Sequence, residues 1–286
     1  MTSLGIIGIT LGDPAGIGPE IVRAALAEAD PRFEYRLIGD PGDATPGQPT
    51  DTTARAAVAA LEESAQLAMA GEIDAVVTGP IHKARAQAVR FEFPGQTEFF
   101  AARARVKNFA MLLTGGALTV ALVTTHVALA DVPRLLTSAE IERVGLLLAD
   151  FLRLRLGRTP HIVVAGLNPH AGESGAMGRE ELDIIAPAVA RLGFTGPLSP
   201  DTLFFRAAAG EFDGVLCMYH DQGLIPLKLH AFDTGVNVTL GLPFVRTSPD
   251  HGTAFEIAGR GIARPDSMLA ALRLAGELVT ARKQKF

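Results

Sequence analysis

Three histidines of this 286-residue chain share one local context, and they could hold a metal ion together. His126, His170 and His220 each follow an apolar run typical of a buried strand, at the point where that run gives way to a loop. In open α/β sheets, ligands bind at the carboxyl ends of the strands. Because three neutral imidazoles leave coordination positions open, the pattern predicts a catalytic divalent metal at these side chains.

Side chains that could bind an anion follow the third of these histidines. Lys228 offers a mobile point charge, Arg246 a bidentate fork, and Asn237 an amide between them. Their position predicts a phosphate or carboxylate site. The runs that separate them are interpreted as short and β-like, including the one that contains His230, and His230 itself is interpreted as structural.

A glycine-rich loop comes next, formed by His251, Gly252, Thr253 and Ala254, and a helix is expected to begin after it. No Gly-x-Gly-x-x-Gly fingerprint follows a strand, so a dinucleotide site here would be of a non-Rossmann type. Glu256 could bond both hydroxyls of an adenosine ribose and would repel a 2′-phosphate, which favours NAD over NADP. The alternative interpretation is a surface glutamate at a helix cap. A second glycine-rich turn, residues 12–20, could present backbone N–H groups to an anion or could be a tight strand-to-helix turn.

Strands and helices alternate along most of the chain, which predicts an α/β fold with a mostly parallel sheet. The clearest expected strands are 4–11, 35–39, 74–77, 118–123 and 161–167. The clearest expected helices are 54–70, 137–156, 180–192 and 267–278.

The composition is that of an ordinary globular protein. A net charge of −5 without a dense Lys/Arg stripe argues against nucleic-acid binding. The single cysteine, Cys217, excludes an intrachain disulfide, and its apolar surroundings predict a buried, inert thiol. We expect a cytoplasmic protein that binds no membrane, because we find neither a signal peptide nor an apolar run of about 20 residues.

Eight segments, in order along nearly the whole chain, resemble the 4-hydroxythreonine-4-phosphate dehydrogenase family. They are LGDPAGIGPE, TGPIHK, PGQTEF, TTH, NPHAGE, PDTLF, YHDQGLIPLK and GVNVTLGLPFVRTSPDHGTAFEIAGRG. The end of the last segment also resembles the nucleotide loop of isopropylmalate and isocitrate dehydrogenases, which share the wider fold.

The resemblance implies two α/β/α domains with a cleft between them. We expect a discontinuous nucleotide-binding domain, residues 1–95 plus 250–286, and a metal, substrate and dimerisation domain, residues 96–249. It implies an NAD-dependent homodimer that requires a divalent metal, zinc, cobalt or magnesium. The enzyme would oxidise and decarboxylate 4-phosphooxy-threonine to 3-amino-2-oxopropyl phosphate in pyridoxal phosphate biosynthesis.

The resemblance also assigns roles to residues. It implies that His126, His170 and His220 bind the metal, with His220 reaching across the dimer. The implied substrate contacts are Gln96, Thr97, Lys228, Asn237 and Arg246, and the implied cofactor contacts are His251, Gly252, Thr253, Ala254 and Glu256. For catalysis, Lys228 is the candidate for proton transfer or phosphate binding. Asp221 and Asp201 could orient a metal-bound histidine or a water molecule.

The sequence departs from the family pattern at three places. Gln96 stands where the family has histidine, Arg264 stands where the isopropylmalate-type loop has asparagine, and the loop at 40–55 is trimmed. Gln96 leaves a paralogous dehydrogenase open, acting on four-carbon sugar-acid phosphates or aromatic cis-dihydrodiols. An alternative of another class is a metal-dependent hydrolase that uses the same histidines without a dinucleotide.

Overall fold

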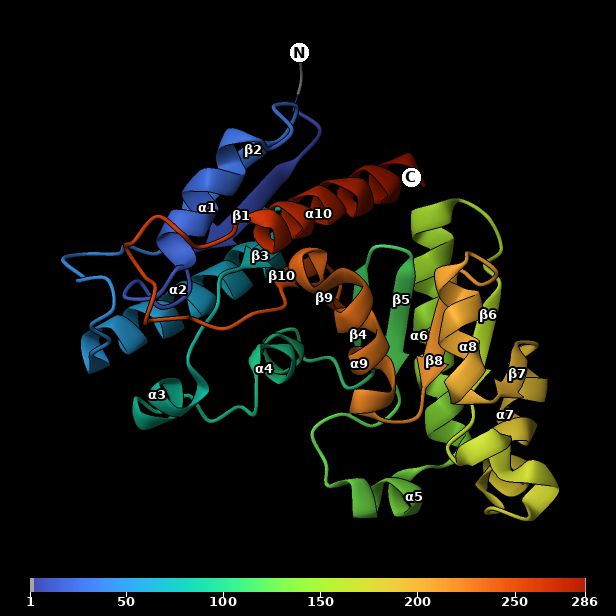
Figure 1. Cartoon of the computed structure of the whole chain (residues 1–286). Coiled ribbons are helices and arrows are strands. Elements are labelled where there is room, and N and C mark those ends of the chain that lie inside the picture. Colours follow the sequence, from blue (N-terminus) through green and yellow to red (C-terminus); the bar gives the residue numbers. More distant parts are fainter. Residues whose placement is uncertain (1–2, 286) are drawn as a thin grey trace. The chain divides into compact units, whose positions relative to one another are not determined.

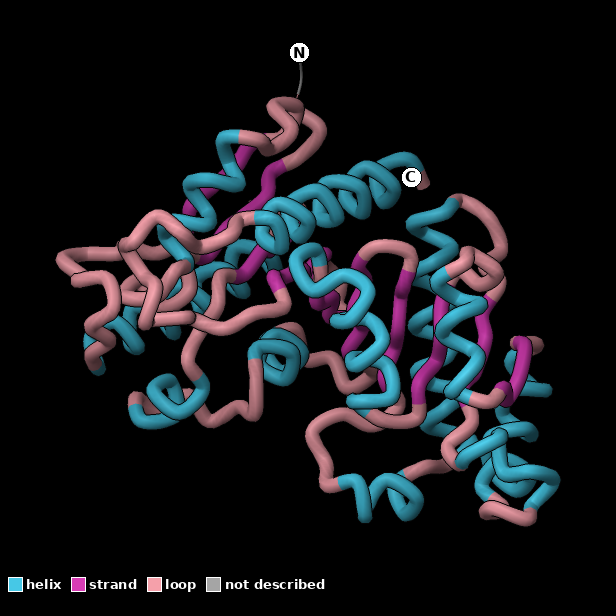
Figure 2. The backbone as a smooth tube through the Cα atoms, viewed as in Figure 1, coloured by secondary structure: helices cyan, strands magenta, loops and turns pink. Residues whose placement is uncertain are grey.

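The computed structural model describes residues 3–285, and strands alternate with helices along it as expected (Figures 1 and 2). The chain divides into two compact units. The first takes the chain up to Lys107 and again from Val236, and the second is Asn108–Gly235. Both ends of the chain therefore belong to the first unit.

The unit boundaries lie at 107/108 and 235/236, whereas the sequence analysis expected 95/96 and 249/250. Helix α4 (Gln96–Arg103) belongs to the first unit because its two phenylalanines pack on aromatic rings of that unit. Phe99 lies 5.5 Å from Phe91 between ring centroids, and Phe100 lies 6.1 Å from Phe244. This aromatic cluster holds α4 to the strands that return after the second unit.

The strands of the first unit run in the order β2-β1-β3-β10-β9, parallel except for the antiparallel pair β10 and β9. Their bounds are β1 Ile6–Thr10, β2 Glu34–Ile38, β3 Ala75–Thr78, β9 Val236–Leu240 and β10 Val245–Pro249. The helices of this unit are α1 Gly18–Ala27, α2 Asp51–Met69, α3 Lys83–Ala88, α4 Gln96–Arg103 and α10 Asp266–Gln284.

The strands of the second unit run in the order β4-β5-β8-β6-β7, and only the hairpin of β4 and β5 is antiparallel. Their bounds are β4 Ala110–Gly115, β5 Leu118–Leu122, β6 Ile162–Ala165, β7 Thr195–Leu198 and β8 Gly214–Cys217. The α-helices are α5 Val132–Leu135, α6 Ser138–Leu156, α7 Ala186–Leu192, α8 Pro200–Ala208 and α9 His220–Ala231. The shorter turns are 3-10 segments at Leu129–Asp131, Pro169–Gly175 and Phe232–Thr234 and a π-turn at Glu181–Ile185.

Every residue of β3, β10, β6 and β8 is buried. Successive side chains of a strand point to opposite faces, so complete burial means that helices or loops cover both faces. This is the reason why the strands appear in the sequence as continuous apolar runs. Cys217 is buried as predicted, and burial raises the pKa of its thiol, which disfavours the reactive thiolate form.

Helix α9 corrects one expectation, because the run around Lys228 and His230 was interpreted as β-like. Leu224 and Leu227 pack into the core of the second unit together with Val120, Val215 and other strand residues, and this apolar contact holds the segment as a helix. His220 therefore begins a helix instead of lying in an open loop. Within residues 3–285, no helix is both long and apolar enough to cross a bilayer.

Candidate functional site

Arg246 of β10 is a buried cation that donates hydrogen bonds to neutral oxygen atoms, and it is 3% exposed. Its Nη2 donates to Thr78 Oγ1 at 2.6 Å and to Gln96 Oε1 at 2.8 Å. Its Nη1 donates to Asn237 Oδ1 and Thr239 Oγ1, both at 3.3 Å. The structure thus brings three of the predicted substrate-binding residues, Gln96, Asn237 and Arg246, into one cluster.

The guanidinium of Arg246 has capacity left for an anion. Its Nε is buried and has no hydrogen-bond partner. Burial lowers the pKa of Arg246 to about 9, and the carboxylate of Glu98 offsets part of that effect. The group is therefore still charged at neutral pH, where a buried charge is stabilised by an anionic partner. A phosphate or carboxylate could supply that charge and accept a hydrogen bond from Nε.

Local structure explains why these side chains converge. Asn237 and Thr239 are two residues apart on β9 and so point to the same face of the strand. Thr78 is the last residue of β3, which pairs in parallel with β10. Gln96 begins α4, and its Nε2 donates to Gly79 O at 3.2 Å. Thr97, the next residue, lies 3.4 Å from Thr239 through the two hydroxyl oxygens.

The two glycine-rich loops singled out in the sequence meet in the first unit. Ile17 N donates to Thr253 O at 2.9 Å, and a Cβ added to Gly16 would lie 2.8 Å from that oxygen. Gly12 lies even closer to the loop after β3, because a Cβ there would come within 2.2 Å of Pro80 O. These glycines allow the loops after β1, β3 and β10 to pack backbone against backbone.

A cavity of about 120 Å³ opens beside these loops. It is lined by Thr78, Gly79, Pro80, Ile81, Lys83, Gly95, Gln96, Ser248, Pro249 and His251. His251 Nε2 is buried there and has no hydrogen-bond partner, so it can meet a polar atom of a ligand. The loops and this unsatisfied nitrogen fit a nucleotide cofactor, and Lys83 and Gln96 fit the polar end of a substrate.

The loop after Ala254 corrects a second expectation, because no helix begins there. Ala254 has φ +42°, and turns continue to the glycines at 259 and 261, which have φ +76° and +68°. Left-handed residues interrupt the right-handed backbone that a helix requires. The next helix is α10, which begins at Asp266. Glu256 is an exposed residue of these turns, so it is not a helix-cap glutamate.

The three histidines follow β5, β6 and β8, which are neighbours in the second unit. His126 and His220 approach each other, with ring centroids 5.6 Å apart and ring planes inclined by 46°. His220 Nδ1 lies 2.7 Å from Asp221 Oδ1, the contact expected of a carboxylate that orients a metal-bound imidazole.

His170 lies in a turn of unusual hand. Residues 170–174 all have positive φ, and only Gly172 among them is a glycine. Each left-handed non-glycine residue costs about 1–2 kcal/mol, so the fold must hold this turn in place. His170 Nδ1 lies 3.2 Å from Glu173 Oε2 within the turn. Strain of this kind points to a functional segment.

Within residues 3–285, no group of three or more histidine, cysteine, aspartate or glutamate side chains is placed to hold a metal ion. The donor chemistry nevertheless fits a divalent metal, because three imidazoles follow neighbouring strands and two of them have carboxylate partners. Within the described part of the chain, the three histidines are present but are not brought together at one metal site.

The remaining predicted residues lie on the helices of the second unit. Asp201, in the first turn of α8, accepts a hydrogen bond from Ser199 Oγ at 2.6 Å. This bond and the nearby His170 lower the pKa of the Asp201 carboxyl, which keeps it ionised. Lys228 is a partly buried residue of α9, two turns after His220.

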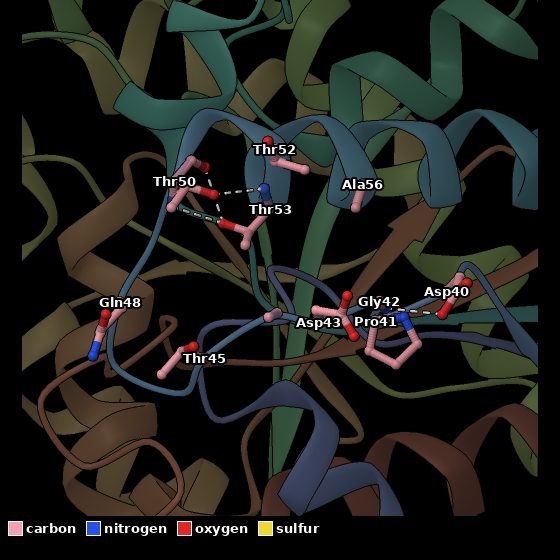
Figure 3. A pocket seen from close by; sticks show the side chains of 11 residues that line it. Asp40, Pro41, Gly42, Asp43, Thr45, Gln48, Thr50, Thr52, Thr53 and Ala56 are labelled. Atoms are coloured by element: carbon pink, nitrogen blue, oxygen red, sulfur yellow. Dashed lines mark hydrogen bonds between the residues drawn. The ribbon is translucent and has the colours of Figure 1, made fainter.

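A second cavity, of about 430 Å³, lies between the loop at 40–50 and the start of α2 (Figure 3). Thr50 caps that helix, since its Oγ1 accepts from Thr53 N at 3.2 Å while Thr53 Oγ1 accepts from Thr50 N at 3.1 Å. Asp40 and Asp43 are its only charged described lining residues, so it does not suit the phosphates of a dinucleotide. None of the predicted site residues lines it.

The polar residues that support Arg246 were not predicted from the sequence. Thr78 and Thr239, which hold Arg246, occur inside apolar strands and carry only a weak signal, a hydroxyl in a buried run. Glu98 lies near Arg246 and has a buried Oε2 without a hydrogen-bond partner.

Comparison with known proteins identifies the family. A sequence profile described as "Pyridoxal phosphate biosynthetic protein PdxA" matches residues 21–275. A 4-hydroxythreonine-4-phosphate dehydrogenase of Methylorubrum populi is 44% identical over 327 residues, which cover 95% of this chain and 94% of that protein. The alignment is longer than this chain, so the relative carries insertions.

Solved structures agree with this match. A 4-hydroxythreonine-4-phosphate dehydrogenase from Klebsiella pneumoniae has a TM-score of 0.81 at 37% identity, over 96% of this chain and 99% of that one. A terephthalate 1,2-cis-dihydrodiol dehydrogenase from Burkholderia xenovorans has a TM-score of 0.69 at 29% identity, over 96% and 98%.

An isocitrate dehydrogenase from Methylococcus capsulatus shares the fold alone, with a TM-score of 0.53 at 17% identity over 100% of this chain and 89% of that one. The predicted isocitrate dehydrogenase-like α/β fold is confirmed. The match to the PdxA profile spans most of the chain, and the Methylorubrum relative covers nearly all of it. The chain therefore belongs to the PdxA family of pyridoxal phosphate biosynthetic proteins.

Proposed function

We propose that this protein is an NAD- and divalent-metal-dependent dehydrogenase acting on 4-phosphooxy-threonine, that is, 4-hydroxythreonine 4-phosphate. The substrate's 3-hydroxyl would be oxidised, and the resulting β-keto acid would lose CO₂ to give 3-amino-2-oxopropyl phosphate. The observation that carries this proposal is the buried Arg246 guanidinium, which is held by neutral oxygens and retains an unsatisfied Nε. A site of this kind favours a substrate that carries an anionic group.

The chain's own residues would bind and orient this substrate. Arg246, with Asn237 and Gln96 beside it, would receive an anionic group, and Thr97 would offer a hydroxyl. The proton of the 3-hydroxyl needs an acceptor, and Lys228 is our candidate for that role. The hydrogen on the same carbon leaves as hydride to the oxidised nicotinamide, which is the chemistry that bound NAD supplies.

His126, His170 and His220 would hold the metal. A bound divalent ion would act as a Lewis acid and make the substrate hydroxyl easier to deprotonate. Asp221 beside His220 and Asp201 near His170 would fix the imidazole orientations. No group of three such donors is placed for a metal within residues 3–285, so we propose that a second copy of the chain completes the set.

Exposed apolar side chains support this homodimer. Ile225, Leu229 and Phe232 are 64%, 89% and 71% exposed, and their spacing places them along one face of α9 and the turn after it. Phe205 of α8, a helix that contacts α9, is 81% exposed. Side chains of this size are typical of interfaces, and apolar patches on a surface mark interaction sites.

Turnover of 4-phosphooxy-threonine with NAD across a series of Zn²⁺, Co²⁺ and Mg²⁺ tests the proposal. We expect NADH formation that stops in chelator and returns with at least one of the metals. A panel with four-carbon sugar-acid phosphates and an aromatic cis-dihydrodiol separates the paralogous activities. Turnover of a panel substrate alone would reassign the specificity, for which the cis-dihydrodiol dehydrogenase neighbour gives a reason. Absence of NAD binding by calorimetry would favour the hydrolase instead.

Replacing Glu256 with glutamine tests the cofactor assignment. We expect the KM for NAD to rise about tenfold, because a charge-assisted bond to the ribose becomes a neutral one. The KM for NADP should fall, since the carboxylate no longer repels a 2′-phosphate. Initial rates with both cofactors give the ratio of the KM for NADP to the KM for NAD. Glu63→Gln, which changes an exposed residue of α2, is the control. An unchanged ratio would remove Glu256 from the cofactor site.

A further inference from the structure

The ends of β5, β8 and β6 are tied together beyond the last pairs of the sheet. Met218 follows the end of β8, and its carbonyl accepts from Thr124 N at 3.1 Å and from Thr124 Oγ1 at 2.8 Å. Thr124 lies two residues before His126, and Met218 lies two residues before His220. This contact fixes the loop after β5 against the loop after β8.

Gln222 continues the connection on the other side of β8. Its Oε1 accepts from Met218 N at 2.7 Å, and its Nε2 donates to Gly166 O at 2.6 Å. Gly166 directly follows β6 and lies four residues before His170. The side chain is 6% exposed, so both bonds are made away from solvent, where an unmade bond is costly.

Glu181 holds the next part of the loop after β6. Its Oε1 accepts from Leu167 N and Asn168 N, both at 2.7 Å, and its Oε2 accepts from Asn168 Nδ2 at 2.9 Å. This carboxylate is 3% exposed. It anchors the backbone immediately before the left-handed turn that carries His170.

We propose that Gln222 is a positioning residue that sets the relative placement of the loops carrying His126, His170 and His220. It is the buried side chain that joins the ends of β8 and β6, and Thr124 extends the same chain of hydrogen bonds to β5. The inference rests on the proposed metal site, because the expected effect of Gln222 is to fix the positions of the three metal-binding histidines before the ion binds. Residues that orient ligands in this way affect metal affinity although they do not touch the metal.

The chemistry requires an amide at this position. Met218 N needs an acceptor and Gly166 O needs a donor, and one amide supplies both. Leucine has a similar size and supplies neither. An ionised glutamate keeps the acceptor for Met218 N but sets a carboxylate oxygen against Gly166 O, so it releases only the loop that leads to His170.

The test measures metal affinity separately from activity. Full-length protein stripped of metal is titrated with Co²⁺, followed by calorimetry and by the visible absorption spectrum of the bound ion. We expect Gln222→Leu and Gln222→Glu to weaken Co²⁺ binding by about 10–100-fold and to change the spectrum. Thr119→Val is the matched control, because it removes a buried 2.8 Å bond to Thr114 at the opposite end of β5. The control should lower the melting temperature and leave Co²⁺ affinity unchanged.

The outcomes separate this inference from the proposed function. If the wild-type protein binds no Co²⁺, the metal site fails and the inference fails with it. If the wild type binds and both Gln222 variants bind equally well with an unchanged spectrum, Gln222 has only a structural role and the inference alone is overturned. If the leucine variant does not fold, as judged by its unfolding transition, the glutamate variant decides on the same criteria.

Discussion

Replacing His170 with alanine is expected to abolish metal-dependent turnover while leaving the fold intact. Loss of one metal ligand removes several kcal/mol of transition-state stabilisation, which corresponds to a decrease of about a thousandfold or more in kcat/KM. The free energy of unfolding should change by less than about 1 kcal/mol, because the side chain is 60% exposed and alanine keeps the same backbone. Steady-state rates over a range of metal concentrations, together with a denaturant titration, measure both effects.

His161→Ala is the matched control. His161 precedes the same strand, β6, at its amino end, where its ring contacts Glu211 O at 3.0 Å and Thr195 Oγ1 at 3.1 Å. Metal dependence should be retained in this variant. Full activity of His170→Ala in buffers of controlled free metal would refute the assignment of His170 as a ligand. Loss of activity in both variants would point to a general effect on the second unit.

Replacing Arg246 with methionine should weaken substrate binding strongly and destabilise the protein little. A charged hydrogen bond contributes about 1.5–3 kcal/mol, so losing the contact of Nε with the anion should lower kcat/KM by about tenfold to a hundredfold. The free energy of unfolding should change by less than about 2 kcal/mol, because methionine removes a buried charge that hydrogen-bonds neutral oxygens, while loss of its attraction to the Glu98 carboxylate offsets part of that gain. Rates over a range of substrate concentrations and a denaturant titration measure the two effects.

The lowered pKa of Arg246 adds a pH signature. The charged form binds the anion, so the KM for substrate should rise as the pH passes through about 9. Between that pH and the ordinary pKa of arginine, the unfolded chain binds more protons than the folded chain, so this group makes stability rise with pH. Both effects should vanish in Arg246→Met. Arg206→Met, which breaks the exposed ion pair with Glu211, serves as the surface control.

The sequence predicted well what depends on local pattern. Buried strands are continuous apolar runs, so β1, β3, β5, β6 and β8 were found, and with them the strand ends that carry the three histidines. The convergence of Gln96 with Arg246 depended on the resemblance, because 150 residues separate the two positions in the chain.

The helix expected after Ala254 failed because left-handed residues interrupt it, and the β-like run expected around Lys228 failed because tertiary contacts outweighed local pattern. The segment around Lys228 alternates in hydrophobicity like a strand and contains Pro226, yet the packing of Leu224 and Leu227 holds it as a helix. The roles of Gln222 and Glu181 could not be predicted, since their partners are backbone groups of other strands. Residues of nearly any type can offer these backbone atoms, so the type of the partner residue does not reveal the hydrogen bond.

The reversed hand of residues 170–174 has a consequence for engineering. Glycine would relieve the left-handed strain at Ala171 or Ser174, so a search for thermostable variants would favour it at either position. Glycine would also let the turn visit backbone conformations that side chains now forbid, and His170 would move with it. Stability gained at this turn would then come at the expense of a fixed imidazole.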